Sequence, residues 1–269
     1  MSWNKNINII MAMDLIKFTI NEGAYVNLDS SWNRDNVTSP YSRLYFILGG
    51  DGIVEHEGNI IPLKPETVYL IPAGMKFNYR CTSNVEKFYM HINAINPDGY
   101  DMMTKFDKIG ELPISDSEIR DLVDFYYSKT IYSAMQLKGR IYDVFLKMQN
   151  KYQFGTEDFQ PYSKMIANVM SYVKENLSAK LNIENVSKNL FISPNTLSKK
   201  FKSEVGKPLG QYIDDLVFFE SQRLLLYSDM TIGQVSEKMG FCDQFYFSRR
   251  FKQKFGENPK DYRIKVGTI

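Results

Sequence analysis

The chain has 269 residues, of which 43% are hydrophobic and 24% are charged. This balance excludes an intrinsically disordered chain, and the length allows two domains because a single hydrophobic core rarely grows beyond about 250 residues. No apolar run approaches the roughly 20 residues that span a bilayer. The apolar patch from Ile7 to Met13 is interrupted by Asn8, unlike a secretory signal. We therefore expect a cytoplasmic protein with no membrane partner.

Charge is divided unevenly along the chain. The whole sequence carries 33 basic and 31 acidic residues, a net charge of +2. Residues 163–269 hold 17 of the basic and 11 of the acidic residues, a net of +6, which leaves −4 for residues 1–162. This asymmetry favours a polyanionic partner for the C-terminal part of the chain.

The cysteines and histidines are few. Cys81 and Cys242 suggest neither a disulfide framework nor a pair of metal ligands, and the surroundings of Cys242 predict that it is buried beside a helix. His56 and His91 are isolated in the sequence, and two isolated imidazoles do not make a first-row metal site. We expect no metal and no cofactor.

Residues 20–95 have the pattern of short strands separated by turns. The stretch 41–48 is rich in aromatic and β-branched residues and is followed by the turn GGDG at 49–52, which predicts a hairpin. Further strands are predicted at 67–74 and 85–92. Many short strands with regular turns are typical of a small barrel or sandwich.

From Ser115 the apolar pattern changes to a helical period. Ser115 and Glu118 predict a capping box at the start of one helix, and a second helix is predicted over residues 130–152. The polar stretch that follows, with Gly155 and Pro161, indicates a linker. We therefore expect an N-terminal domain over 1–152, a linker over 153–162 and an all-helical domain over 163–269.

The helical part contains a repeat with an offset of fifty residues. SKKFKSEVG at 198–206 is followed by SRRFKQKFG at 248–256, and a tyrosine follows each at the same distance, Tyr212 and Tyr262. A short helix precedes each copy, at 183–190 and 231–240. The sequence therefore predicts two helix-turn-helix units, with a long helix from about 209 to 228 between them.

The second helix of each unit has one apolar and one polar face. The apolar positions recur at i, i+4 and i+8, which predicts a buried face; they are Leu197, Phe201 and Val205, then Phe247, Phe251 and Phe255. Arg, Lys, Asn and Gln on the opposite face are the residue types that read base edges, while Ser and Lys hold phosphates. A solvated basic face is the competing interpretation, and the repetition in matching context argues against it.

The segments FKSEVGKPLGQY, LLLYS and TIGQVSEKMGFCDQFYFSRRFKQKFGENPKDYR resemble the DNA-binding domain of the AraC/XylS transcription regulators. The resemblance covers about residues 163–263 and implies seven helices, with the second helices of both units in successive major grooves of DNA. Together with the polar faces, it gives ten predicted DNA-binding residues: Asn195, Thr196, Ser198, Lys199, Lys202, Gln244, Phe245, Ser248, Arg249 and Lys252.

Three features depart from the pattern of that family. Val217 stands where the family often has arginine in the linking helix, which puts one polar contact in doubt. Ser187 and Ser236 replace the usual alanines of the first helix of each unit. Phe191 occupies a turn position where many helix-turn-helix units have glycine.

The N-terminal stretch LYFILGGDGIVEHEGNIIPLKPETVYLIPAGMKFNY is similar to the cupin-like sensor barrel of the arabinose-regulator type. Phe77 stands where enzymatic cupins place a histidine ligand, so metal catalysis is not expected. Aromatic faces and guanidiniums in this region suit a sugar-like effector; the candidates are Trp32, Arg34, Arg43, Tyr45, Phe77, Tyr79 and His91. Each has a competing interpretation as a core or rim residue, and for His91 a hydrogen-bonded strand position is favoured.

These observations predict an α+β protein with two domains, a cupin-like barrel with trailing helices and a double helix-turn-helix domain. The expected function is a sequence-specific transcription activator that binds double-stranded DNA and RNA polymerase, responds to a small molecule such as a carbohydrate, and forms a homodimer. The helix at 130–152 is the dimer interface by family analogy, or else packs against the barrel. The alternatives are a regulator without a ligand, whose barrel serves dimerisation or protein interaction, and a cupin enzyme fused to a DNA-binding domain. We do not expect an enzyme.

Overall fold

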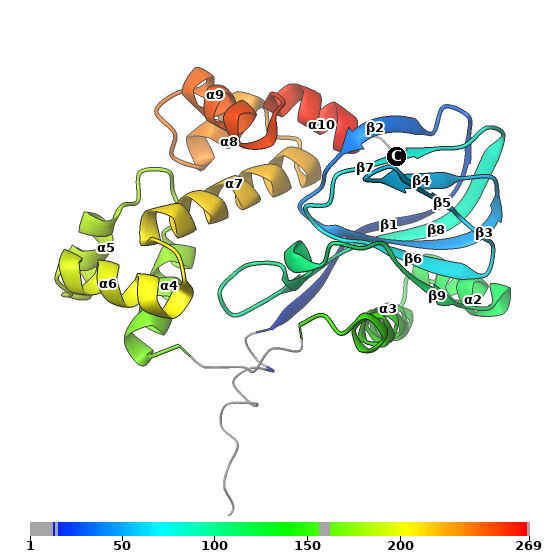
Figure 1. Ribbon diagram of the computed structural model, residues 1–269, viewed down its shortest axis with the longest axis horizontal. Helices are drawn as coiled ribbons and strands as arrows, with labels where there is room; N and C mark the ends of the chain where they lie inside the picture. Colours follow the sequence, from blue (N-terminus) through cyan, green and yellow to red (C-terminus); the bar gives the residue numbers. More distant parts are fainter. Residues whose placement is uncertain (1–12, 14–15, 156–161, 268–269) are drawn as a thin grey trace, which may run out of the picture. The chain divides into compact units, whose positions relative to one another are not determined.

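The computed structural model describes residue 13 and residues 16–155 and 162–267. The chain divides into two compact units, one over Met13–Asp158 and one that contains Phe159–Ile269. The first is built mainly from strands and the second from helices (Figure 1). The expected α+β class is therefore confirmed. No helix in the described part of the chain is long and apolar enough to cross a membrane.

The strands of the first unit form two antiparallel sheets. The larger sheet has the order β1-β8-β3-β6-β9 and the smaller the order β2-β7-β4-β5. The larger sheet comprises β1 (Lys17–Asp29), β8 (Asn84–Ile95), β3 (Ser42–Gly50), β6 (Thr67–Ile71) and β9 (Gly110–Pro113). The smaller comprises β2 (Asn33–Val37), β7 (Phe77–Arg80), β4 (Ile53–His56) and β5 (Asn59–Pro62). The three predicted strands correspond to β3, β6 and β8; β9 lies beyond the region where the sequence predicts strands.

The register of β3 against β8 gives the larger sheet two different faces. Arg43 pairs with His91 and Tyr45 pairs with Tyr89. Because side chains alternate along a strand, the intervening residues point to the other face. That other face is apolar, and it contributes Leu44, Phe46, Phe88, Met90 and Ile92 to the core.

Two helices cover this apolar face, α2 (Asp116–Tyr127) and α3 (Ile131–Tyr152). The predicted capping box of Ser115 and Glu118 is present at the start of α2. Thr130 forms a second capping box with Ser133 at the start of α3. A short 3-10 helix, η1 (Met102–Lys105), precedes β9, and its buried Met103 joins the same core.

Seven helices make up the described part of the second unit, the number that the resemblance implied. They are α4 (Lys164–Glu175), α5 (Ile183–Leu190), α6 (Pro194–Val205), α7 (Leu209–Tyr227), α8 (Ile232–Lys238), α9 (Gln244–Phe255) and α10 (Pro259–Gly267). Ser193 and Asp243 cap α6 and α9 through their side chains, and Pro194 is the first residue of α6, as predicted. α7 runs between the α5–α6 pair and the α8–α9 pair (Figure 1).

The sequence repeat reappears as a repeat of geometry. Both second helices end at a left-handed glycine, Gly206 with φ 81° and Gly256 with φ 83°. Phe201 packs edge-on against Tyr212 with ring centroids 5.2 Å apart. Phe251 packs against Tyr262 at the same 5.2 Å. The repeated letters therefore specify the same cap and the same aromatic contact twice.

Two sequence expectations need correction. Cys242 is exposed and lies in the turn before α9, because the buried position of that turn is taken by Phe241. Val205 and Phe255 are half-buried, since each lies in the last turn of its helix, whereas the other four apolar anchors are fully buried. Six residues of the expected linker, 156–161, lie outside the described residues.

Two buried serines lead to a prediction on stability. The hydroxyls of Ser187 and Ser236 are buried and find no hydrogen-bond partner among the described residues. Because an unsatisfied buried hydroxyl is costly, Ser187→Ala and Ser236→Ala should each raise the free energy of unfolding by about 1 kcal/mol. Denaturant melts would measure this. Ser221 is the control, since its buried hydroxyl donates to the Val217 carbonyl, and Ser221→Ala should bring no gain. Loss of stability in both serine variants would contradict the prediction.

Candidate DNA-reading surface and barrel chamber

In each helix-turn-helix unit, the turn between the two helices contains a residue in the left-handed backbone conformation. In the second unit it is Gly240, with φ 76°, and a Cβ there would collide with the side chain of Ser178. In the first helix-turn-helix unit the left-handed residue is Phe191, with φ 56° and 97% of its surface exposed. The phenylalanine occupies a backbone conformation that suits glycine, without packing to offset the strain.

The predicted DNA-binding residues gather on one face of α6 and one face of α9. On α6, Asn195, Ser198, Lys199 and Lys202 stand at i, i+3, i+4 and i+7, and all four are exposed. Residues three and four apart are neighbours on a helix surface, so they form one continuous strip. Thr196, also exposed, flanks this strip.

The strip on α9 has the same spacing. It consists of Phe245, Ser248, Arg249 and Lys252, of which Ser248 is half-buried and the others exposed. Gln244, the first residue of α9, is exposed beside it. We call the α6 strip with Thr196 the first head, and the α9 strip with Gln244 the second head.

The basic residues of the second unit serve two different purposes. Within the described residues, Lys199, Lys202, Arg249 and Lys252 form no ion pair. Their neighbours differ. Arg250 pairs with Asp214 at 2.6 Å. Lys254 contacts Asp214 at 2.9 Å and Asp215 at 2.8 Å, and Lys207 contacts Asp215 at 3.2 Å.

Helix α7 holds both helix-turn-helix units in place. Its 19 residues span roughly 28 Å at 1.5 Å per residue. Phe218 on α7 packs against Phe247, Phe251 and Phe255 of α9. Val217 is 1% exposed and belongs to this core. The side chain of Val217 therefore offers no surface contact here.

In the strand-rich first unit of the chain, six of the seven effector candidates lie together between the two sheets. Arg43, Tyr45 and His91 come from the inner face of the larger sheet, and they meet residues of the smaller sheet. Trp32 stacks on Tyr79 with centroids 4.5 Å apart, and the Arg43 guanidinium lies 5.7 Å from the Phe77 ring. All six are less than 5% exposed. We call this buried cluster of side chains between the sheets the chamber.

Arg34 is separate from the chamber group. It is half-exposed on β2, and its guanidinium donates to the carbonyl of the preceding residue, Asn33. The position of β2 explains the difference, because β2 is an edge strand of the smaller sheet and leaves this long side chain open to solvent.

His91 is a hydrogen-bonded strand residue, the interpretation that the sequence favours. Its Nδ1 lies 3.2 Å from Glu22 Oε2, and its Nε2 lies 3.3 Å from Arg43. Burial lowers its pKa to about 3, with Glu22 opposing the shift. The imidazole is therefore neutral, so Nδ1–H donates to Glu22 and Nε2 accepts from Arg43. Tyr41 stacks on the ring at 4.1 Å.

Four chamber residues were missed from the sequence: Glu22, Tyr41, Lys87 and Tyr89. Lys87 is the most unusual, because it is fully buried and its ammonium lies 3.7 Å from the Tyr45 ring centroid and 4.0 Å from that of Trp32. A signal was present, since Lys87, Tyr89 and His91 alternate along one strand and so share a face.

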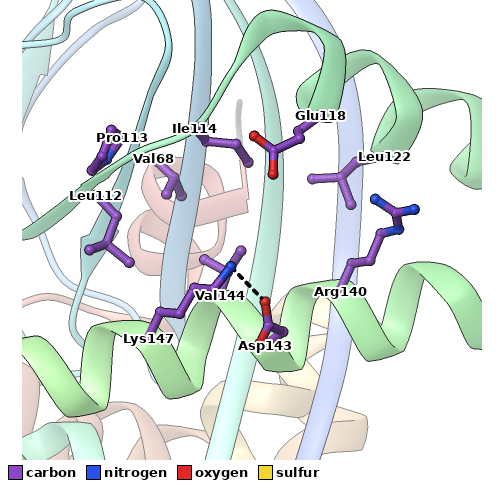
Figure 2. Close-up of a pocket in the computed structure, with 10 residues that line it drawn as sticks. All are labelled: Val68, Leu112, Pro113, Ile114, Glu118, Leu122, Arg140, Asp143, Val144 and Lys147. Atoms are coloured by element: carbon purple, nitrogen blue, oxygen red, sulfur yellow. Dashed lines mark ion pairs between the residues drawn. The ribbon is translucent and has the colours of Figure 1, made fainter.

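A hollow lies on the helix side of the larger sheet. It has a volume of about 90 Å³, and Val68, Leu112 and Leu122 form part of its wall. Figure 2 shows its polar rim, on which Lys147 and Asp143 form an ion pair at 2.9 Å. Because Arg140 also faces an acid, Asp121 at 3.8 Å, the charges of this hollow are balanced by the protein itself.

Comparison with known proteins identifies the helical unit. A family model described as a helix-turn-helix domain matches residues 186–265. The multiple antibiotic resistance protein MarA of Salmonella typhimurium is 34% identical over 99 residues, which are 37% of this chain and 78% of MarA. The chain belongs to the AraC family of transcription regulators.

Other relatives of this AraC-family chain match over a longer stretch. The arabinose operon regulatory protein of Escherichia coli is 22% identical over 233 residues, 82% of this chain and 79% of that protein. The regulatory protein PocR of Salmonella typhimurium is 25% identical over 161 residues, 56% of this chain, and the match spans about half of PocR (53%). These regulators establish DNA binding and transcription regulation as the activity of the family.

A solved structure shares the two-unit fold. The structure of unsaturated fatty acid-bound ToxT from Vibrio cholerae superimposes with a TM-score of 0.53, at 16% identity, over 94% of this chain and 96% of ToxT. Among the described residues of the AraC-family chain, no group of three or more His, Cys, Asp or Glu side chains could hold a metal ion.

The strained turn of the first helix-turn-helix unit, at Phe191, gives a second prediction. Phe191→Gly should raise the free energy of unfolding by about 1 kcal/mol, because glycine adopts positive φ without a Cβ clash and the exposed ring makes no packing contribution. Gly206→Ala is the matched control. It introduces a Cβ into open space at φ 81° and should lower the free energy of unfolding by a similar amount. Denaturant melts measure both, and a loss on Phe191→Gly would contradict the strain argument.

Proposed function

We propose that this AraC-family regulator reads two unlike half-sites of DNA with its two heads, under the control of a small molecule in the chamber. The observation that carries the proposal is the same exposed spacing, i, i+3, i+4 and i+7, on α6 and on α9. Unpaired cations within both strips suit contact with a polyanion. Repetition of such a strip is not needed for solubility or folding.

The long helix sets the distance between the heads. Successive major grooves lie about 34 Å apart on one side of B-DNA, and α7 spans roughly 28 Å. Helices packed against the two ends of such a spacer can enter neighbouring grooves. This arrangement explains why α7 is locked to α9 by an aromatic core and ion pairs rather than by a flexible turn.

Residue chemistry assigns roles within each head. Arg249 suits bidentate reading of guanine, and Asn195 suits adenine. Gln244 also suits adenine, and Phe245 suits contact with a thymine methyl. Thr196, Ser198, Ser248, Lys199, Lys202 and Lys252 suit phosphates, with further base contacts from Lys199. Since Asn195 in the first head corresponds to Phe245 in the second, the two half-sites should differ in sequence.

The chamber is the proposed effector site of the first unit. The ToxT structure contains a bound unsaturated fatty acid, and one relative is a regulator of an arabinose operon; both point to small-molecule control in similar chains. An effector can act only by binding one arrangement of the two units more tightly than another. We propose that this shift activates transcription through contact with RNA polymerase.

Helix α3 is the proposed dimer interface. One face of it is apolar and exposed, with Ile131 at 83%, Met135 at 70% and Leu146 at 41%. Gly139 lies in the same region, and a Cβ there would meet nothing in the described chain. A mid-helix glycine is unfavourable by about 1 kcal/mol relative to alanine. If α3 of a second copy packed closely against this helix, it would cover the apolar face and would use the space left by Gly139.

Arg249 provides the test of DNA reading. Arg249→Ala should weaken binding to the specific site by about 1 to 3 kcal/mol, with a smaller effect on random DNA, because a base contact is lost. Binding isotherms on both DNAs at one salt concentration measure this. Lys180→Ala, which removes an exposed charge outside both heads, is the control. Equal weakening on both DNAs would reassign Arg249 to a phosphate.

The α3 interface has its own test. Met135→Glu should convert a dimer to a monomer in sedimentation experiments, because two copies of the charge would be buried in one apolar seam. Tyr127→Glu, a change at a 55% exposed position on α2, should leave the dimer intact. A wild-type chain that sediments as a monomer at all concentrations, or a Met135→Glu dimer, would refute the proposed interface.

A further inference from the structure

Two cationic side chains lie inside the chamber, where charge is costly. Arg43 is 3% exposed and Lys87 is fully buried. They stand on neighbouring strands, since Arg43 belongs to β3 and Lys87 to β8, which pair with each other. An unpaired buried charge is strongly destabilising, so such side chains normally contact a carboxylate.

No carboxylate among the described residues forms an ion pair with either cation. The Arg43 guanidinium contacts only neutral groups within hydrogen-bond distance: the hydroxyls of Tyr41 and Tyr45, at 3.3 Å and 3.5 Å, and His91 at 3.3 Å. Within the same described residues its Nε has no partner, and neither has Lys87 Nζ. Glu22 is the nearby acid, but it contacts His91 and Tyr89, and its side chain is 42% exposed.

Aromatic rings alone do not satisfy the ammonium of Lys87. The rings of Trp32 and Tyr45 attract it through cation–π contacts. An ammonium nevertheless has three N–H donors, and ring faces do not replace three hydrogen bonds. Burial, and secondarily the charge of Arg43, lower the pKa of Lys87 well below its usual value. The protein therefore leaves its charged form without adequate stabilisation.

We propose that the chamber binds a small organic carboxylate, with its anionic group held between Lys87 and Arg43. This inference rests on the proposed effector function and narrows it, because a neutral sugar would leave both cations unpaired. A carboxylate accepts bonds from the ammonium and from the free Nε of the guanidinium together. The stacked pair of Trp32 and Tyr79 offers an apolar wall for the rest of the molecule.

Matched pairs of acids and neutral analogues test the ligand class. The probes are glucuronate against glucose, benzoate against benzyl alcohol, and octanoate against 1-octanol, each added to the full chain in a calorimetric melt. At least one acid should raise the Tm by roughly 5 °C at a hundred times its Kd, and its neutral analogue should not. Equal shifts within every responsive pair, or no shift with any acid, would overturn the proposal.

Variants of Lys87 separate a binding role from a structural one. Lys87→Met should raise the Tm of the free protein, because it removes a buried amino group that has no hydrogen-bond partner among the described residues, and should abolish the shift caused by the acid. Lys87→Arg should keep at least part of that shift. Lys76→Met, at an exposed lysine, is the control and should change neither. A lower Tm or loss of folding in Lys87→Met would show that the lysine is a structural anchor and refute the inference.

DNA-binding measurements distinguish failure of the carboxylate inference from failure of the proposed regulatory function. The wild-type chain should bind the specific DNA site in the absence of any acid, and Lys76→Met should bind it with unchanged affinity. If a neutral analogue stabilises the chain while DNA binding remains specific, effector control survives and the carboxylate class is wrong. If the specific site is not bound at all, the proposed function fails independently of Lys87.

Discussion

The packing of α9 against α7 is the constraint on which the DNA-reading surface depends. Phe218 inserts between the aromatic anchors of α9, and Asp214 holds Arg250 and Lys254 at the edge of the same contact. Rotation of α9 about its axis would break the aromatic contacts and the ion pairs together. The direction of the second head is therefore fixed by the core and not by the turn before α9. The first head is held similarly through Phe201 and Tyr212.

The first unit shows how one sheet can serve two purposes. Alternation along β3 and β8 sends Leu44, Phe88 and Met90 into the core beneath the helices and sends Arg43, Lys87 and His91 into the chamber. A slip of one residue in the register would exchange these sets and place both cations in the apolar core. Packing of the apolar face beneath the helices therefore fixes the register that keeps Arg43 and Lys87 on the chamber face of the larger sheet.

The sequence predicted the helical unit better than the chamber, for physical reasons. Caps, glycine ends and apolar spacing are local signals, so Ser193, Gly206 and the anchors of α6 and α9 were found, and the repeat checked each prediction against its copy. Lys87 was missed because burial of a lysine depends on pairing of strands that are distant in sequence. Cys242 was misplaced because its neighbour Phe241 occupies the buried position. The proposed contacts to DNA and effector were predictable only as residue types.

The acid pairs on α7 also change how the charge of the second unit should be understood. Asp214 and Asp215 hold Lys207, Arg250 and Lys254 in ion pairs within the protein, so these three basic residues do not belong to the surface that faces a polyanion. Four cations remain in the two heads, Lys199, Lys202, Arg249 and Lys252. If all four displace counterions, they contribute a slope of roughly −3.6 per chain to the logarithmic dependence of affinity on salt. Affinity should therefore fall roughly 150-fold for a fourfold rise in salt, which is less than if every basic residue of the second unit met the polyanion.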